Sequence, residues 1–592
     1  MAYLIDIKDK LTDFGKAVLK DRYLMPGEDY KDLFIRVAKA YSNNEQSAER
    51  LYSYMSKMWF MPSTPILSNG GTNRGLPISC FLNECDDSLK GIADIWNENV
   101  WLASKGGGIG SYWGNVRSIG ENIGINGKTS GIMPFIKVMD SLTLAISQGS
   151  LRRGSAAVYL PINHPEIEEF IDIRRPTGDN NRRTLNLHHA VCITDEFMKA
   201  VEFDLRWDLI SPATGGVISK IGARDLWVKI LSARMETGEP YILYIDNINK
   251  HIPKHHKELG LSVKTSNLCS EITLPTGKDH LGNERTAVCC LSSLNLEYFD
   301  EWKNDKQFIL DIMYMLDNVL EDFIQRAPEE MKNAKYAASR ERSVGLGVMG
   351  LHSYFHKNMI PFESAAAKSM NKKFFSYIQN EVNLASISIA KEKGACPDAK
   401  DCGLMERFSN KTAIAPTASI SIITGGTSPG IEPSSGNYYT HKTLTGSFPV
   451  KNLYLEALLE TKGMNTQDIW SSIANNDGSV AHLECLSDYE KSVFKAAHEI
   501  SQPWLVDLMA DRAQYIDQAA SNNLFVKSDI SKKELHKIHF NAWKNGVKSL
   551  YYLRSLSLSR AEKVSIMVEK RKTKKVIEND GQSLYDECLA CQ

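Results

Sequence analysis

The chain has 592 residues, and its 70 lysines and arginines against 71 aspartates and glutamates give a formal net charge of −1. Its hydrophobic content of 43% and charged content of 24% are typical of a soluble globular protein. A neutral chain lacks the cationic surplus that binding to a nucleic acid polymer requires. No stretch approaches the roughly 18 apolar residues of a membrane-spanning helix, and charges interrupt the first segment, MAYLIDIKDK. We therefore expect a cytoplasmic protein without a membrane segment.

Helical and strand-like segments alternate along the chain. Residues 10–58 carry charged and aromatic residues at helical spacing, and glycine clusters separate short apolar runs between residues 62 and 154. Residues 308–324 and 366–393 have the periodicity of long packed helices, and Gly394 and Pro397 close the second one. Together with the strand-like segments VYLPI, YILYI, AVCCL and IAPTASISIIT, these helices predict an α/β architecture.

Eleven cysteines in a chain without an export signal indicate reduced thiols. Two of them, Cys588 and Cys591, form a C-x-x-C pair near the C-terminus, in a polar tail that begins at about residue 560 and has few core-forming residues. A dithiol on a flexible tail can exchange with a disulfide formed elsewhere in the protein. The alternative is half of a zinc site, but no second pair of ligands occurs nearby, so we predict no metal site.

The motif Gly345-Leu-Gly347-Val-Met-Gly350 matches the dinucleotide-binding fingerprint but lacks its setting. The charged segment SRERS stands where the preceding strand should be, and no second strand carries the ribose-binding acid. We interpret these glycines as sites of close backbone packing.

The segment Asn267-Leu-Cys269-Ser-Glu271 concentrates chemically useful groups. If it is a strand, its amide, thiol and carboxylate project from the same face and line one wall of a pocket. A carboxylate can act as a general base on a hydroxyl, and a thiol can act as a nucleophile, hydrogen-atom donor or redox group. On this pattern alone, a buried structural cysteine is an equally good interpretation.

At this point the chain resembles the large, catalytic subunit of class I ribonucleotide reductase, from about residue 50 to its last residue. The matching segments are ordered along the chain: STPILSNGGTNRGLPISCFL, DDSLKGI, SKGGGIG, SQGSLRRGSAA, SNLCSEI, AVCCLSSLNL, RSVGLGVMGL, APTASISI, GIEP, SLYYLR and the terminal CLAC. The resemblance implies the reduction of ribonucleoside diphosphates to deoxyribonucleotides by thiyl-radical chemistry.

The resemblance implies a role for each reactive side chain. Cys269 would become the thiyl radical that removes the ribose 3′-hydrogen. Glu271 would take the proton of the 3′-hydroxyl, and Asn267 would hold that part of the sugar. Cys80 and Cys289 would form the reducing dithiol that ends as a disulfide. If AVCCL is a strand, Cys290 points away from Cys289 and is structural.

Adjacent tyrosines Tyr551 and Tyr552 in SLYYLR resemble the family's radical relay. They favour class I, in which a separate, metal-containing small subunit supplies the radical and the large subunit binds no cofactor tightly. A cobalamin-dependent class II reductase is the alternative within the same chemistry. An alternative of another class is a non-enzymatic nucleotide- or zinc-binding scaffold.

The remaining expected sites bind nucleotides. A loop leading into a helix suits a diphosphate, because it offers hydroxyls and free backbone N–H groups. The resemblance implies substrate contacts at Ser63, Thr64, Ser79, Pro416, Thr417, Ala418, Ser419 and Ile420. It implies control of specificity by dNTP or ATP effectors at Asp87, Lys105, Arg117, Gln148, Arg152 and Arg153.

For the fold, the resemblance implies a ten-stranded α/β barrel with a helical N-terminal region and a flexible tail. We expect a helical region at 1–60, too short for the family's ATP-cone, a catalytic barrel with a smaller appended α/β region at 61–559, and a redox tail at 560–592. The implied partners are the small subunit, thioredoxin or glutaredoxin, the nucleotide substrates and a second copy of the chain in a homodimer.

Overall fold

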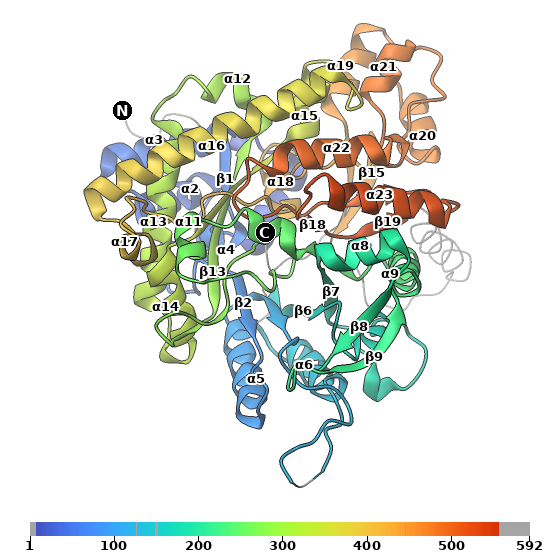
Figure 1. Ribbon diagram of the computed structural model, residues 1–592. Coiled ribbons are helices and arrows are strands. Elements are labelled where there is room, and N and C mark those ends of the chain that lie inside the picture. Colours follow the sequence, from blue (N-terminus) through green and yellow to red (C-terminus); the bar gives the residue numbers. More distant parts are fainter. Residues whose placement is uncertain (1–6, 126, 149–151, 444–445, 556–592) are drawn as a thin grey trace, which may run out of the picture.

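A ring of strands forms the centre of the molecule, and helices surround it (Figure 1). The structure is a computed structural model and describes residues 7–125, 127–148, 152–443 and 446–555. Nine strands are hydrogen-bonded in one sheet. Among the described helices, none is both long and apolar enough to cross a membrane.

The first half of the ring contains five parallel strands. They pair in the order β2 (Cys80–Glu84), β3 (Gly108–Tyr112), β6 (Ser155–Pro161), β7 (His188–Ile193) and β10 (Tyr241–Tyr244). The helices that connect them are α5 (Leu89–Ser104), α6 (Met133–Ala145), α7 (Ile167–Ile171), α8 (Asp195–Phe203) and α9 (Ala223–Thr237). Parallel strands require crossovers of this kind, because the chain must return to the same end of the sheet before it begins the next strand.

The strands of the second half are also parallel to one another, and they run in the direction opposite to those of the first half. The second half consists of β13 (Ala287–Asn295), β14 (Val344–Met349), the extended segments 410–415 and 518–522, and β18 (Ser549–Leu550). Single bridges link Leu346 to Thr412 and Ile414 to Ala520, and Tyr551 N donates to Asn522 O at 2.8 Å.

Antiparallel pairs join the two halves, β13 to β2 and β10 to β18. The described residues thus form a ring of ten segments, which confirms the predicted barrel. Strand β1 (Phe60–Pro62) pairs with β13 beyond the end of β2.

Side chains alternate between the inside and outside of the ring, as strand geometry requires. One buried cluster contains residues from alternate positions of the strands: Cys80 and Leu82, Ala157 and Tyr159, Ala190 and Cys192, Tyr241 and Leu243, and Ala287, Cys289 and Leu291. Intervening residues such as Phe81, Val158 and Cys290 belong to a second cluster that packs against the helices. The ring therefore has a separate interior core.

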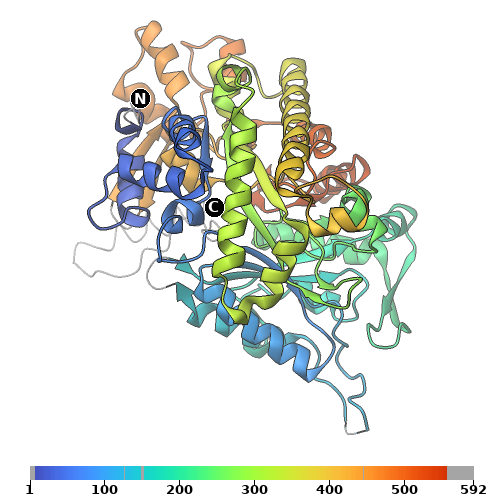
Figure 2. The same ribbon diagram turned by 90° about the vertical axis from the view of Figure 1, so that its left-hand side faces the viewer.

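Further outer helices come from the N-terminal, middle and C-terminal parts of the chain. The N-terminal helices are α1 (Asp13–Arg22), α2 (Tyr30–Tyr41), α3 (Glu45–Ser56) and α4 (Thr64–Asn69). Later helices are α13 (Phe308–Arg326), α14 (Lys332–Glu341), α15 (Leu351–Lys357), α16 (Ala365–Lys393), α22 (Gln502–Ala513) and α23 (Lys532–Lys544). Figure 2 shows α13 in front of the barrel. Helices α13 and α16 confirm the two long helices expected from periodicity.

Smaller elements lie at the periphery. A separate apolar cluster holds together α19 (Leu453–Thr461), α20 (Gln467–Asn475) and α21 (Asp488–Val493), next to the hairpin of β15 (Tyr438–Thr443) and β16 (Gly446–Lys451). Other short strands form the pairs β4 (Ser147–Gln148) with β5 (Arg152–Arg153), β8 (Arg206–Ile210) with β9 (Val217–Gly222), β11 (Gly277–Lys278) with β12 (Glu284–Arg285), and β17 (Leu524–Val526) with β19 (Leu553–Ser555). Short helices are α10 (Ile245–Lys250), α11 (Lys254–Glu258), α12 (Phe299–Trp302), α17 (Pro397–Asp401) and α18 (Ala418–Ile423).

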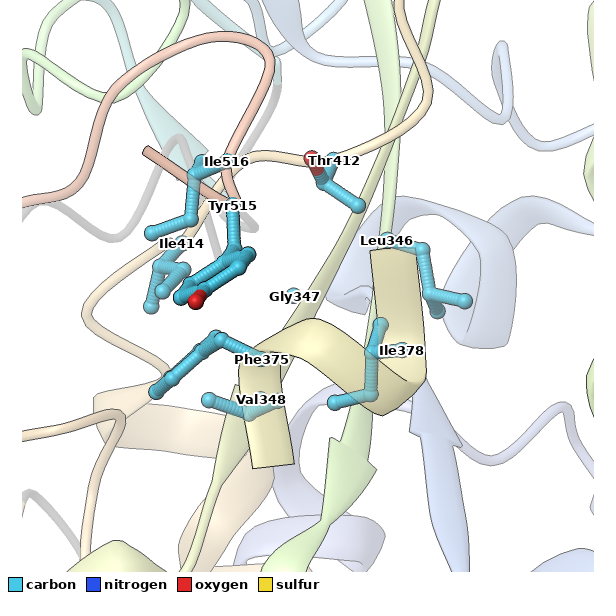
Figure 3. A pocket seen from close by; sticks show the side chains of 9 residues that line it. All are labelled: Leu346, Gly347, Val348, Phe375, Ile378, Thr412, Ile414, Tyr515 and Ile516. Carbon is cyan, nitrogen blue, oxygen red and sulfur yellow. The ribbon is translucent and has the colours of Figure 1, made fainter. Parts of the chain in front are cut away.

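Strand β14 explains the glycine motif. A Cβ at Gly347 would overlap the backbone oxygen of Ala413, and a Cβ at Gly345 would lie 3.0 Å from Cys289 Sγ. The glycines thus allow segment 410–415 to approach, and the interpretation as close packing is confirmed. Outside this wall, Leu346 and Val348 line a small apolar cavity against α16 (Figure 3). Its lining contains none of the predicted site residues.

Candidate active site

The loop that carries Cys269 runs through the interior of the ring. Residues 265–274 are at most 3% exposed. The strand that was considered as one possibility for residues 267–271 does not form: residues 268–270 make a turn, and Ser270 adopts a φ of 64°. The side chains of Asn267 and Glu271 meet because the turn folds back, and not because they share one face of a strand.

Backbone contacts hold this loop against both halves of the barrel. Gly110 on β3 has no side chain, and a Cβ there would overlap the carbonyl oxygen of Ser266. Tyr159 on β6 donates its hydroxyl hydrogen to Asn267 O. From the opposite half, Ala519 N donates to Glu271 O at 2.9 Å. The loop is therefore fixed before any ligand binds.

Asn267 connects the reactive groups. Its Nδ2 donates to Glu271 Oε1 at 2.9 Å and lies 3.9 Å from Cys80 Sγ. Its Oδ1 accepts from Ile272 N at 3.2 Å, which fixes the orientation of the amide, because a backbone N–H can only donate. The predicted amide and carboxylate thus form one hydrogen-bonded unit next to a thiol.

Glu271 is fully buried, and its surroundings favour the protonated form. Burial raises the pKa of Glu271 to about 7, while hydrogen bonds from Asn267 and Ser521 act in the opposite direction. A carboxyl group with a pKa near neutrality can both accept and return a proton.

Cys80 and Cys289 lie directly opposite each other. They are register partners in the antiparallel pair of β2 and β13, and both are reduced cysteines that are 1% exposed. Directly opposite residues have Cβ atoms about 4.5–5.5 Å apart, so a disulfide needs only a small adjustment. Burial raises the pKa of Cys289 well above its usual range. Cys290 belongs to the outer cluster, which confirms that the two neighbours point to opposite faces.

A stack of tyrosines leads to Cys269. Tyr551 OH lies 3.5 Å from Cys269 Sγ, and the ring centroids of Tyr551 and Tyr552 are 4.2 Å apart. Both residues lie between β18 and β19, in the chain segment that closes the barrel. Tyr241 packs against them, with centroids 4.7 Å from Tyr551 and 5.1 Å from Tyr552.

Sequence reasoning missed three residues that contact this group. Ser521 Oγ lies 2.6 Å from Cys269 O and 3.1 Å from Glu271 Oε2, and Gln518 Nε2 lies 3.6 Å from Cys289 Sγ. Tyr241 was assigned only to the strand-like segment YILYI. The buried polar run DQAASNN could have marked Gln518 and Ser521, because it interrupts apolar segments without turn-forming glycines.

The predicted substrate-binding residues lie where strands or extended segments begin or end. Pro62 pairs with Ser292 and Cys80 with Cys289, so Ser63 and Ser79 flank the same stretch of β13. Thr64 begins α4 and contacts Tyr23 OH at 2.9 Å. The remaining candidates, Pro416, Thr417, Ala418, Ser419 and Ile420, follow the extended segment and lead into α18. The expectation of a loop entering a helix is confirmed, whereas the strand-like interpretation holds only up to residue 415.

The predicted effector residues form two groups. Asp87 and Arg117 make an ion pair, with Arg117 Nη2 2.9 Å from Asp87 Oδ2. Lys105 follows the far end of α5, whose 16 residues span roughly 24 Å, and that helix contacts β4. Gln148 pairs with Arg152 in the β4–β5 hairpin, which also contains Arg153.

The expectation for the tail concerns a part that the structure does not cover. Cys588 and Cys591 lie outside the described residues. Within the described residues, no group of three or more histidine, cysteine, aspartate or glutamate side chains is arranged to bind a metal ion.

Comparisons with known proteins show the family to which the chain belongs. Residues 78–406 and 399–553 match the family described as ribonucleotide reductase, barrel domain, and residues 9–75 match the ribonucleotide reductase all-alpha domain. The chain is 41% identical to the ribonucleoside-diphosphate reductase large subunit of Invertebrate iridescent virus 3, over 95% of this chain and 97% of that protein. It is also 41% identical to a putative large subunit of Frog virus 3, over 96% of both. The class Id ribonucleotide reductase alpha subunit of Actinobacillus ureae superposes with a TM-score of 0.82 at 35% identity, over 92% of this chain and 97% of that one.

Proposed function

Because this chain belongs to the family of class I ribonucleotide reductase large subunits and is a ribonucleoside-diphosphate reductase, we propose that Cys269 carries the radical and that Cys80 and Cys289 supply the electrons. In the overall reaction, a ribose 2′-hydroxyl and two thiols give a deoxyribose, a disulfide and water. The observation that carries this assignment is the 3.5 Å contact between Tyr551 OH and Cys269 Sγ at the end of the tyrosine stack.

The two tyrosines connect Cys269 with the small subunit. Tyr552 passes the radical to Tyr551, which takes the hydrogen atom from Cys269 and leaves a thiyl radical. The small subunit, with its metal centre, supplies the radical to Tyr552. The 4.2 Å ring separation supports this relay, because direct contact lets an electron move between the rings without an intervening group.

The substrate is positioned by Asn267 and Glu271. Cys269 removes the 3′-hydrogen, and Glu271 accepts the proton of the 3′-hydroxyl, which helps the neighbouring 2′-hydroxyl leave as water. A carboxyl group with a pKa of about 7 is suited to this step, since a general base works best when its pKa is close to the working pH. The pair of Cys80 and Cys289 provides the protons and electrons and closes into a disulfide.

Binding and recycling are assigned on the same basis. The diphosphate would bind at Thr417–Ile420, Ser63, Thr64 and Ser79, where hydroxyls and backbone N–H groups replace a basic surface. The chain would form a homodimer, and effector nucleotides would bind to it. Their contacts would be the Asp87–Arg117 ion pair of one copy and the residues near the Lys105 end of α5. The tail dithiol, Cys588 and Cys591, would reduce the internal disulfide and be reduced in turn by thioredoxin or glutaredoxin.

The test uses two cysteine variants, assayed with the cognate small subunit and CDP. Cys269→Ser should abolish deoxynucleotide formation and leave nucleotide binding intact. Cys290→Ser is the matched control, because that thiol lies on the outer face of β13 and its loss should leave turnover unchanged. Appreciable turnover by the Cys269 variant would contradict the assignment. A requirement for cobalamin in place of the small subunit would support the class II alternative.

A further inference from the structure

Gln518 is a buried amide that contacts three separate parts of the site. Its side chain is 0% exposed. Oε1 accepts from Thr273 N at 3.1 Å, which ties it to the loop of Cys269. Nε2 donates to Val344 O at 3.1 Å on β14, and it lies 3.6 Å from Cys289 Sγ.

These contacts fix which way the amide points. A backbone N–H can only donate, so the atom facing Thr273 must be the oxygen. The carbonyl oxygen of Val344 can only accept, so it requires the nitrogen. Both neighbours therefore demand the same orientation, and the N–H of Gln518 necessarily faces the sulfur of Cys289.

The segment around Gln518 is held rigidly. Lys548 is 2% exposed, and its Nζ donates to the carbonyl oxygens of Ile516, Asp517 and Gln518. Thr412 Oγ1 accepts from Asp517 N at 2.8 Å, and Gln518 N donates to Thr412 O at 3.1 Å. A side chain anchored at both its backbone and its tip can place an N–H group accurately.

The strength of a hydrogen bond donated at this position depends on the charge of the Cys289 sulfur. An anionic sulfur accepts a hydrogen bond more strongly than a neutral thiol does, because a charged acceptor strengthens the bond. The N–H group therefore stabilises the Cys289 sulfur most as it loses its proton, and it stabilises a disulfide sulfur least. Asn267 provides a comparable amide 3.9 Å from Cys80 Sγ.

We propose that Gln518 is a positioning residue that holds the Cys289 sulfur in place and stabilises it while the Cys80–Cys289 dithiol is oxidised. This inference rests on the proposed function for its role in turnover. Its effect on the dithiol itself does not need the substrate or the small subunit.

The first test compares two substitutions in a single turnover of the pre-reduced holoenzyme with CDP. Gln518→Met removes the donor, and since a neutral hydrogen bond contributes about 0.5–1.5 kcal/mol, the rate should fall about threefold to tenfold at every pH. Gln518→Glu keeps an acceptor for Thr273 N, but it has only one proton to share between Val344 O and the sulfur, and it loses that proton as pH rises. Its rate relative to the wild type should therefore fall as pH rises, whereas the relative rate of the Met variant should stay constant.

The second test measures the dithiol without catalysis. The isolated chain is equilibrated in mixtures of reduced and oxidised dithiothreitol, then denatured and alkylated, and the fraction of Cys80–Cys289 disulfide is determined by mass spectrometry. Gln518→Met should be half oxidised at an oxidant ratio about threefold to tenfold lower than the wild type, because the reduced state loses more stabilisation than the disulfide. Gln514→Met is the matched control, since that exposed side chain lies four residues away, and it should show no shift.

The outcomes separate the two proposals. A wild-type enzyme that forms no deoxynucleotide would overturn the proposed function, and a redox shift in Gln518→Met would still support the role of Gln518. Unchanged single-turnover rates and an unchanged redox midpoint in Gln518→Met would overturn that role. A relative rate of Gln518→Glu that does not depend on pH would also overturn it, because the donor would then be unnecessary.

Discussion

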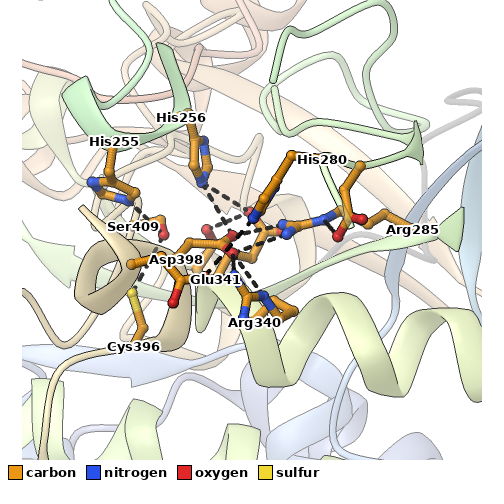
Figure 4. A network of polar contacts seen from close by, with 12 residues as sticks. His255, His256, His280, Arg285, Arg340, Glu341, Cys396, Asp398 and Ser409 are labelled. Atoms are coloured by element: carbon orange, nitrogen blue, oxygen red, sulfur yellow. Dashed lines mark hydrogen bonds and ion pairs between the residues drawn. The ribbon is translucent and has the colours of Figure 1, made fainter. Parts of the chain in front are cut away.

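Two buried carboxyl groups of this protein, Asp398 and Glu271, have opposite kinds of neighbour. In the network of Figure 4, Arg285 donates to Asp398 at 2.7 and 2.9 Å and to Asp279 at 3.0 Å, and Arg340 Nε donates to Asp398 at 2.8 Å. Inside the barrel, Glu271 is equally buried, but its partners are the neutral side chains of Asn267 and Ser521.

The difference appears in the protonation of the two carboxyl groups. Arginine neighbours lower the pKa of Asp398 below its usual range even though burial opposes this. Burial raises the pKa of Glu271 to about 7, because neutral donors compensate only part of the desolvation. The first carboxylate is held in one charge state and serves stability, whereas the second can change its charge near neutral pH.

The largest expected effect is on turnover, at Glu271. Glu271→Gln keeps the size and the contact with Asn267 but removes the proton acceptor, so turnover should fall by about 10²–10⁴-fold. At a pH near 4.5 the Glu271 carboxyl is still protonated in the folded chain and is as neutral as the amide that replaces it, so we expect stability there to change by less than about 1 kcal/mol. Steady-state turnover and chemical denaturation measure the two effects. A large loss of stability would show that Glu271 resembles Asp398 after all.

The reverse result is expected at Asp398. Asp398→Asn leaves Arg285 and Arg340 without their shared counter-charge, and breaking a buried ion pair in this way costs about 3–5 kcal/mol. The free energy of unfolding, measured by denaturant titration, should fall accordingly. Asp94→Asn is the control, because its partner Lys90 is exposed and the change should stay within about 0.5 kcal/mol. Equal effects of the two substitutions would contradict the structural role of the network.

The site loop is held mainly by close packing, which predicts a smaller effect at Gly110. Gly110→Ala places a Cβ against the carbonyl oxygen of Ser266, and overpacking of this kind costs about 1–3 kcal/mol. Because the strain falls on the segment that leads to Asn267, turnover should fall as well. Gly216→Ala is the control, since a Cβ there meets only Thr214 Oγ1 at 3.3 Å. An unchanged melting temperature in the Gly110 variant would show that the loop is free to move.

The last expected effect is a gradual change of stability with pH. The pKa of Glu271 is about 7 in the folded chain and near the ordinary glutamate value of 4.5 in the unfolded chain, so the folded state binds more protons between these values. The stability of the wild type should therefore fall relative to Glu271→Gln as pH rises from about 4.5 to about 7. Asp398 contributes with the opposite sign, since its stabilisation is lost only as pH falls below the usual aspartate range. Denaturant titrations of the wild type and of Glu271→Gln at several pH values measure this difference in stability. Parallel curves would contradict the raised pKa of Glu271.

The local sequence predicted much of the outer architecture. The periodicity at 308–324 and 366–393 gave α13 and α16, and the alternation in AVCCL separated Cys289 from Cys290. These features depend on residues close together in the chain. The closure of the ring by ten segments was implied only by resemblance, because two of those segments have almost no regular pairing.

The segment SNLCSEI predicted several of the side chains that form the site, but it did not predict how its own backbone folds. The turn at Ser270 could not be read from SNLCSEI, because its positive φ belongs to a non-glycine residue that the surrounding barrel holds in place. Gln518, Ser521 and Tyr241 were missed because each reaches the site from a segment far away in sequence. The network around Asp398 was also missed, since its charged residues come from widely separated helices and strands.

The order of strands in the ring has a consequence for synthesis of the protein. Cys80, Cys269 and Cys289 all precede residue 290, but Tyr551 and the strand that closes the barrel come some 260 residues later. A chain still being made from its N-terminus therefore contains the proposed reducing dithiol and the proposed radical cysteine before it contains the strand that closes the barrel around them. The proposed tyrosine relay is among the last described segments to be added, so under that proposal a nascent chain has no route by which a radical could reach Cys269.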